Sequence, residues 1–151
     1  MSNFILSGVD DVVSVTLTNV PNTPEALADI FGAVAGINLD MICQTSPYKG
    51  RINLSFTIDS GALAATLITV GGIKEAYGDV VTEVSPGNCK FMLYSELLKT
   101  QSGVAARLFK ALADNDLQIK LITTSDTEIT ILLESINYEK IKTVLEKEFC
   151  E

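Results

Sequence analysis

The residues that usually perform chemistry are few in this chain and lie far apart. It contains no histidine, so it lacks the commonest general base, the usual partner of a nucleophilic serine or cysteine, and the commonest transition-metal ligand. Cys43, Cys89 and Cys150 form no CxxC pair and predict reduced thiols rather than a disulfide framework or a zinc site. Neither a GxxxxGK phosphate loop nor a GxSxG nucleophile elbow occurs. The sequence therefore favours binding over catalysis, with no metal and no cofactor.

Two neighbouring acids, Asp10 and Asp11, are the one pair that resembles a metal or acid/base site. Adjacent residues of a strand point to opposite faces, so the two carboxylates would not converge on one ligand. We interpret the pair as a turn.

The strongest candidate for a binding site is a strand that runs directly into a helix. Val13, Val15 and Leu17 alternate with polar residues, which is typical of a strand with one buried face. In the following VPNTPEALADIFGAV, Thr23 is a good N-cap and Pro24 suits the first helical position. The first amides of a helix lack intrahelical partners and favour an anion by about 0.3–1 kcal/mol. Judged from the local residues alone, such a helix start is more often a simple capping arrangement than a ligand site.

The elements that must position this site follow from hydrophobic spacing. Leu27, Ile30, Phe31 and Val34 share one face of the helix, and Gly36 ends it. Four further elements are predicted: a strand over Leu39–Cys43, a strand in which Ile52, Leu54, Phe56 and Ile58 alternate, a helix from Ser60 through Leu63, Leu67 and Ile68 to Gly71–Gly72, and a strand over Val80–Val84.

The second half repeats the first, with Phe31, Ala33 and Ala35 aligning with Phe109, Ala111 and Ala113. The predicted elements of this half are a strand over Phe91–Tyr94, a helix through Ala105, Leu108, Phe109 and Leu112, strands over Ile119–Thr123 and Ile129–Leu133, and a helix capped by Asn137 with Ile141, Val144, Leu145 and Phe149 on one face.

Each copy therefore predicts a β-α-β-β-α-β unit, which is the ferredoxin-like plan of an α+β fold. The second copy ends on its helix and lacks its last strand, and the apolar segment Phe4–Val9 can supply it. We expect a first unit over residues 11–84, inserted into a second unit made of residues 1–10 and 85–151.

Composition limits the partners. The 151 residues are 47% hydrophobic, and 19 acids against 11 Lys and Arg give a net charge of -8, which disfavours nucleic acid. No apolar run is long enough to span a membrane, and the first residues lack the pattern of a secretory signal. A cytoplasmic location is expected.

Two segments carry a resemblance to a known family. VTLTNVPNTPEALADIFGAV followed by INLDMICQT, and KTQSGVAARLFKALA followed by KLITTSD, resemble the regulatory region of aspartokinases, in which two ACT units are interleaved. The match is most specific at Asn38, Asp40, Met41, Ile42 and Gln44 and is weaker in the second half. The kinase domain and its nucleotide-binding segments have no counterpart, so the resemblance implies a non-catalytic regulatory part.

The same resemblance implies an amino-acid effector site at the first helix start and the following strand. The residues carried over are Asn22, Thr23, Pro24, Glu25, Leu27, Ile37, Asn38, Asp40 and Gln44, with Ser125 and Asp126 reaching in from the other unit. Asn22 stands where lysine-sensing relatives usually carry an aspartate, and Ser102 replaces a proline at the second helix start, which points to unequal sites.

The resemblance thus implies a module that senses a free amino acid such as threonine or lysine. We expect a homodimer, and the family pattern also allows a catalytic aspartokinase subunit as a partner. The alternative is an ACT scaffold that holds subunits together and binds no ligand.

Overall fold

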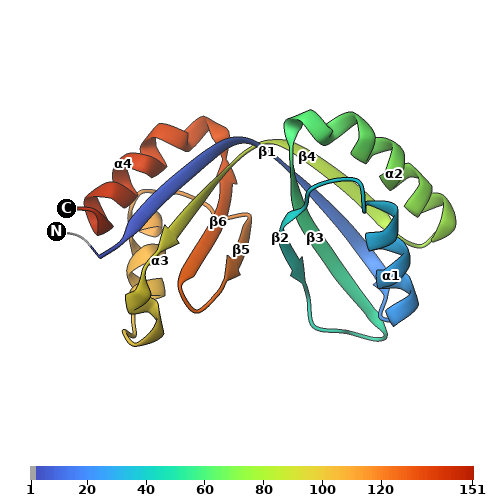
Figure 1. Cartoon of the computed structure of the whole chain (residues 1–151), viewed down its shortest axis with the longest axis horizontal. Helices are drawn as coiled ribbons and strands as arrows, with labels where there is room; N and C mark the ends of the chain where they lie inside the picture. Colours follow the sequence, from blue (N-terminus) through green and yellow to red (C-terminus); the bar gives the residue numbers. More distant parts are fainter. Residues whose placement is uncertain (1–2) are drawn as a thin grey trace. The chain divides into compact units, whose positions relative to one another are not determined.

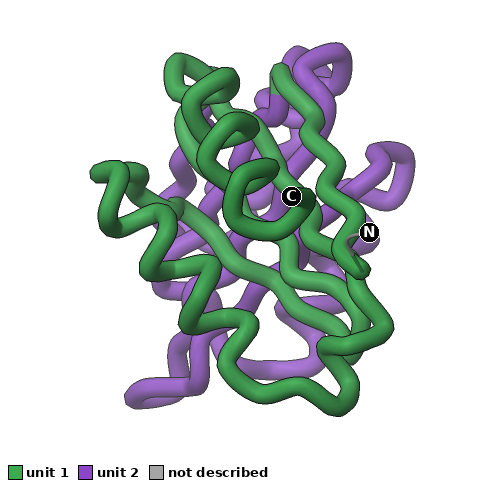
Figure 2. Tube along the Cα trace, turned by 90° about the vertical axis from the view of Figure 1, so that its left-hand side faces the viewer, with its two compact units in different colours: residues 1–11, 87–151 green, residues 12–86 purple. Residues whose placement is uncertain are grey.

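The computed structural model describes residues 3–151, so the first two residues of the predicted 1–10 segment lie outside the described residues. The chain divides into two compact units (Figure 2). One, which we call the inserted unit, is Val12–Pro86 and is purple in the figure. The other, which we call the split unit, combines residues 1–11 with Gly87–Glu151 and is green.

Two long strands belong to both units. Strand β1 spans Ile5–Pro21 and β4 spans Val81–Tyr94. The turn predicted at Asp10–Asp11 is wrong, because β1 passes through it. Asp11 takes a left-handed φ of 59°, and its amide donates to Asp10 Oδ1 at 2.9 Å. Aspartate adopts this conformation more readily than most residues, and the carboxylate of Asp10 binds the Asp11 amide in it, so the strand continues.

Strand β4 likewise joins the two strands predicted at Val80–Val84 and Phe91–Tyr94. Gly87 lies between them with a φ of +81°, a value that glycine adopts without steric cost. The sequence predicted both segments as strands but not the residue that lets them run on as one.

The inserted unit is completed by helix α1 (Pro24–Ala33), strands β2 (Asp40–Gln44) and β3 (Arg51–Asp59), a short 3-10 turn (Ser60–Ala62) and helix α2 (Leu63–Ala76). Its strands follow the order β2-β3-β1-β4, and β3 is antiparallel to both neighbours, with Val15 opposite Phe56. Both helices lie on one face of these strands (Figure 1). The core between them contains Ile30, Phe56 and Val70.

Helix α2 differs from its prediction. It continues through Gly71 and Gly72, and it buries Thr66, Val70 and Ile73, whereas Leu67 and Ile68 are exposed. Each mid-helix glycine costs about 1 kcal/mol relative to alanine. Burial of Val70 and Ile73 on either side of the pair offsets that cost, so the local glycine signal does not end the helix.

The split unit contains a 3-10 turn (Glu96–Lys99), α3 (Val104–Asp114), β5 (Leu121–Thr124), β6 (Glu128–Glu134), a second 3-10 turn (Ser135–Asn137) and α4 (Tyr138–Phe149). Its strands follow the order β1-β4-β6-β5, with β6 antiparallel to β4 and β5. Its core contains Phe91, Leu108 and Ile141. Asn137 stands before α4, but its side chain makes no capping hydrogen bond.

The α+β fold class is confirmed, and the strand order in each unit is consistent with the ferredoxin-like plan. No helix within residues 3–151 has the length and apolar character needed to cross a membrane.

Candidate functional site

The start of α1 is the best-defined feature among the predicted site residues. Thr23 is extended and caps the helix, with its Oγ1 accepting from the Ala26 amide at 3.1 Å, and Pro24 occupies the first helical position. The Asn22 amide donates to the carbonyl of Gly50 at 2.9 Å, which ties this start to the β2–β3 hairpin. The predicted capping is confirmed.

The same contacts alter the expected chemistry of the helix start. Thr23 engages two first-turn amides, those of Ala26 and Leu27, the second through its carbonyl at 3.4 Å. The prediction that the amides of this turn all point outward without partners is therefore wrong. The helix dipole still favours an anion here, but Glu25 places an exposed carboxylate on the same turn.

The predicted residues on and before β2 separate into two groups. Gln44 ends β2 opposite Leu54, whereas Asp40 begins it opposite Thr57. Because β1 ends beside Arg51 at the start of β3, Gln44 lies at the same end of the sheet as the α1 start. Asp40 lies toward the far end, about 10 Å away, because its partner Thr57 is three positions along β3 from Leu54 at 3.3 Å per residue.

Ile37, Asn38 and Asp40 all belong to that far end. Ile37 packs against the core, and its amide donates to the Val34 carbonyl at 2.9 Å. Asn38 is exposed, while Asp40 accepts from its neighbour Met41 at 2.9 Å and from the Thr57 hydroxyl at 3.0 Å. The structure therefore places Asn22, Thr23, Pro24, Glu25, Leu27 and Gln44 at one end of the inserted unit and Ile37, Asn38 and Asp40 at the other.

Ser125 and Asp126 form the turn between β5 and β6 of the split unit. The Ser125 amide donates to Glu128 O at 2.8 Å, and Ser125 Oγ accepts from the Thr127 amide at 3.3 Å. Asp126 is exposed, and its charge is one of the influences that raise the pKa of Lys99, after the larger effect of Glu96.

Comparison with known proteins agrees with the resemblance in the sequence. Residues 92–149 match the model of an ACT domain. The chain is 30% identical, over 97% of its length, to 37% of an aspartokinase from Bacillus sp. strain MGA3. It superposes with a TM-score of 0.84 and 27% identity on 95% of a chain in the crystal structure of aspartokinase alpha and beta subunits. The chain is therefore similar to part of an aspartokinase.

The fold is also that of an isolated subunit. The regulatory subunit of aspartate kinase from Thermus thermophilus, in its ligand-free form, has the same fold, with a TM-score of 0.86, 24% identity and coverage of 96% of its chain. The present chain spans only 37% of the Bacillus enzyme. The similarity to that enzyme therefore concerns a little over a third of its length.

The two helix starts of this aspartokinase-like chain are unequal. Gly103 precedes α3 with a left-handed φ of 85° and provides no side-chain cap, whereas Thr23 caps α1. Within residues 3–151, no three His, Cys, Asp or Glu side chains form a group that could hold a metal ion.

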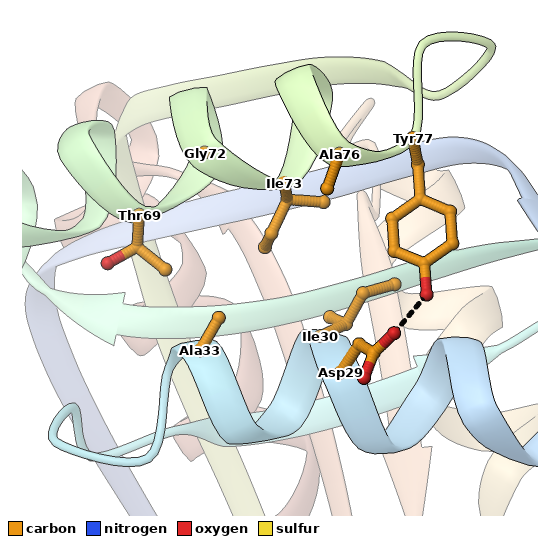
Figure 3. Close-up of a pocket in the computed structure, with 8 residues that line it drawn as sticks. All are labelled: Asp29, Ile30, Ala33, Thr69, Gly72, Ile73, Ala76 and Tyr77. Atoms are coloured by element: carbon orange, nitrogen blue, oxygen red, sulfur yellow. Dashed lines mark hydrogen bonds between the residues drawn. The ribbon is translucent and has the colours of Figure 1, made fainter.

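A pocket between α1 and α2 was not anticipated from the sequence. It measures about 350 Å³, and its lining includes Ile30 and Ala33 of α1 and Ile73 of α2. At its rim the Tyr77 hydroxyl donates to Asp29, as Figure 3 shows, and this hydrogen bond raises the pKa of Tyr77. The lining contains one carboxylate and no cation, so it offers no partner for the carboxylate of an amino acid.

Proposed function

We propose that this chain is a regulatory ACT module that binds a free amino acid and passes the binding event to a partner subunit. The observation that carries the proposal is the similarity to an aspartokinase subunit over 95% of both chains. We further propose that the inserted unit and the split unit are each one ACT domain.

The proposed effector site is the end of the inserted unit that contains the α1 start and Gln44. A free amino acid has a carboxylate and an ammonium, which require donors and acceptors respectively. The positive end of α1 supports the first group, and the Glu25 carboxylate and the Gln44 amide can serve the second. Ile37, Asn38, Asp40, Ser125 and Asp126 remain part of the proposal as residues of a larger, multi-segment site.

Threonine and lysine are the amino acids that the family resemblance suggests. Asn22 carries no charge, so it cannot form an ion pair with the side-chain ammonium of lysine. The Glu25 carboxylate is assigned above to the ammonium that every free amino acid carries, so Asn22 leaves the side chain of lysine without an acid at this helix start, and we propose threonine of the two.

One observation supports the scaffold alternative. Thr23 already satisfies the amides of Ala26 and Leu27, so this helix start is stable without a ligand. In that case the ACT units would serve only to hold subunits together.

Thermal unfolding in the presence of each of the twenty amino acids separates the two functions. A ligand at 100 times its Kd stabilises the folded state by ~2.7 kcal/mol, so an effector should raise the melting temperature measurably. We expect one or a few amino acids, threonine among them, to do so. If none of them shifts the midpoint at millimolar concentration, the sensing function is wrong and the scaffold is favoured.

The proposed output is a change in subunit packing. We propose a homodimer, a catalytic aspartokinase subunit as a further partner, and a cytoplasmic location. A coupling free energy of ~1–3 kcal/mol between effector binding and subunit packing is typical of allosteric proteins. Sedimentation of the isolated chain with and without the stabilising amino acid measures the dimer directly.

A further inference from the structure

The β2–β3 hairpin of the inserted unit contains a pocket of about 480 Å³ whose lining residues are mostly of polar types and include no predicted effector residue. Its walls come from three segments: the end of β1 at Thr18 and Asn19, the hairpin connection around Lys49, and the beginning of β3 at Arg51 and Asn53. A pocket of this size accommodates a small metabolite.

The charge of this pocket is opposite to that of the unit around it. Residues 12–86 contain seven acids and only three basic residues, Lys49, Arg51 and Lys74. Two of those three line the pocket, and no Asp or Glu does. In a chain with a net charge of -8, this is a local concentration of positive charge without a compensating carboxylate in the lining.

A β-bulge holds one of the two cations in place. Leu17 pairs with Leu54 and Val20 pairs with Ile52, so the two residues between them on β1 face a single residue on β3. Asn19, one of the two, has a φ of 68°, and its carbonyl accepts from Arg51 Nη1 at 3.4 Å. The bulge therefore orients the guanidinium, which retains further N–H donors.

The neighbouring turn places the second cation beside an aromatic ring. Tyr48 and Arg51 exchange backbone hydrogen bonds of 2.9 and 3.0 Å, and the two residues between them have φ values of 50° and 75°. These are the angles of a tight type I′ hairpin turn. The Lys49 ammonium lies 5.4 Å from the centre of the Tyr48 ring.

We propose that Lys49 and Arg51 form a binding site for a small dicarboxylate. Arginine matches the planar carboxylate through paired N–H donors, while lysine acts as a point charge for the second anionic group. An amino acid with a neutral side chain fits less well, because its ammonium finds no carboxylate in the lining. The site therefore differs in ligand class from the effector site proposed at the α1 start.

Titration with succinate, with NaCl adjusted to hold the ionic strength constant, tests this assignment. Binding is followed by NMR through the side-chain amides of Asn19 and Asn53, which line the pocket. We expect saturable shifts at millimolar succinate, weaker shifts with glycine, and no tighter binding of inorganic phosphate. Absence of saturation, or tighter binding of phosphate than of succinate, overturns the dicarboxylate site.

Three charge-neutralising variants locate the site. Arg51→Gln should weaken succinate binding by about tenfold, and Lys49→Gln, in an exposed turn, should weaken it severalfold. Lys74→Gln on α2 removes the same charge from the unit but does not line the pocket, so the affinity should not change. Equal affinities in all three variants would place succinate elsewhere. The link between the α1 start and this hairpin is a backbone hydrogen bond from Asn22 to Gly50, which side-chain variants leave in place, so the amino-acid panel reports on the effector site separately.

Discussion

At the scale of single residues, one buried thiol belongs to the hydrophobic core of the split unit. Cys89 is fully buried and donates to the Glu134 carbonyl at 3.6 Å. Burial raises its pKa to about 11, and the charge of Asp10 adds to the effect. Asp10 accepts a hydrogen bond of 2.6 Å from the Ser135 hydroxyl, and this bond holds the pKa of the carboxyl below its usual value.

Alkylation should therefore distinguish the three cysteines. The thiolate is the reactive form, and access also limits the rate. Cys150 is exposed, whereas Cys43 is half-buried and Cys89 is inaccessible. Iodoacetamide at pH 8 followed by peptide mass spectrometry should show Cys150 modified first and Cys89 last. Modification of Cys89 as fast as that of Cys150 in the folded protein would contradict this packing.

The hydrogen bond to Asp10 predicts a pH-dependent effect of Ser135→Ala. Because the pKa of Asp10 is lowered in the folded state, its contribution to stability is present above the unfolded value of about 3.9 and is lost as the pH falls through the folded pKa. Urea unfolding should show Ser135→Ala less stable than the wild type at pH 7, with the difference shrinking below about pH 4.

Ser102→Ala is the matched control, because Ser102 is exposed in the loop before α3. It should leave stability unchanged at both pH values. A difference between Ser135→Ala and the wild type that stays constant with pH would rule out the ionised Asp10 as the partner.

At the scale of elements, α1 and β3 follow directly from the sequence. Thr23, Pro24 and an apolar face define α1, and the alternating Ile52, Leu54, Phe56 and Ile58 are all buried in β3. These elements are predictable because local preference and burial agree. Helix α2 is not predictable in this way. The Gly71–Gly72 pair disfavours a helix locally, whereas the burial of Val70 and Ile73 stabilises it.

Capping should make a measurable contribution to the stability of α1. Thr23→Ala removes the acceptor of the Ala26 amide and should destabilise the chain by about 1 kcal/mol in urea unfolding. Thr23→Ser keeps a hydroxyl at the same position and should recover most of that loss. Equal stability of the alanine variant and the wild type would show that the cap is energetically unimportant.

At the scale of the whole molecule, the duplication in the sequence predicts both units and the insertion of one into the other. The candidate site is less predictable, because the set carried over from relatives spans both ends of the inserted unit and reaches into the split unit. The hairpin pocket was missed because the bulge in β1 places Asn19 beside Arg51, and single-sequence spacing does not reveal that bulge.

Gln44 offers a direct mutational test of the effector site. Its side chain is exposed at the end of β2, so Gln44→Ala should not unfold the chain. Loss of one polar contact should lower the affinity for the stabilising amino acid by about tenfold. Gln118→Ala, at an exposed glutamine of the split unit, should not change the affinity. Unaltered affinity in both variants would remove Gln44 from the site.

The measurement that tests the central claim most directly is NMR mapping of the backbone amides during titration with the amino acid that stabilises the chain most. The account predicts that the largest shifts occur at Asn22–Leu27 and Gln44, at the α1 end of the inserted unit. Smaller shifts at Ser125 and Asp126 would be compatible with a site that extends to the split unit. Shifts absent from the α1 start, with saturation observed elsewhere, would contradict it.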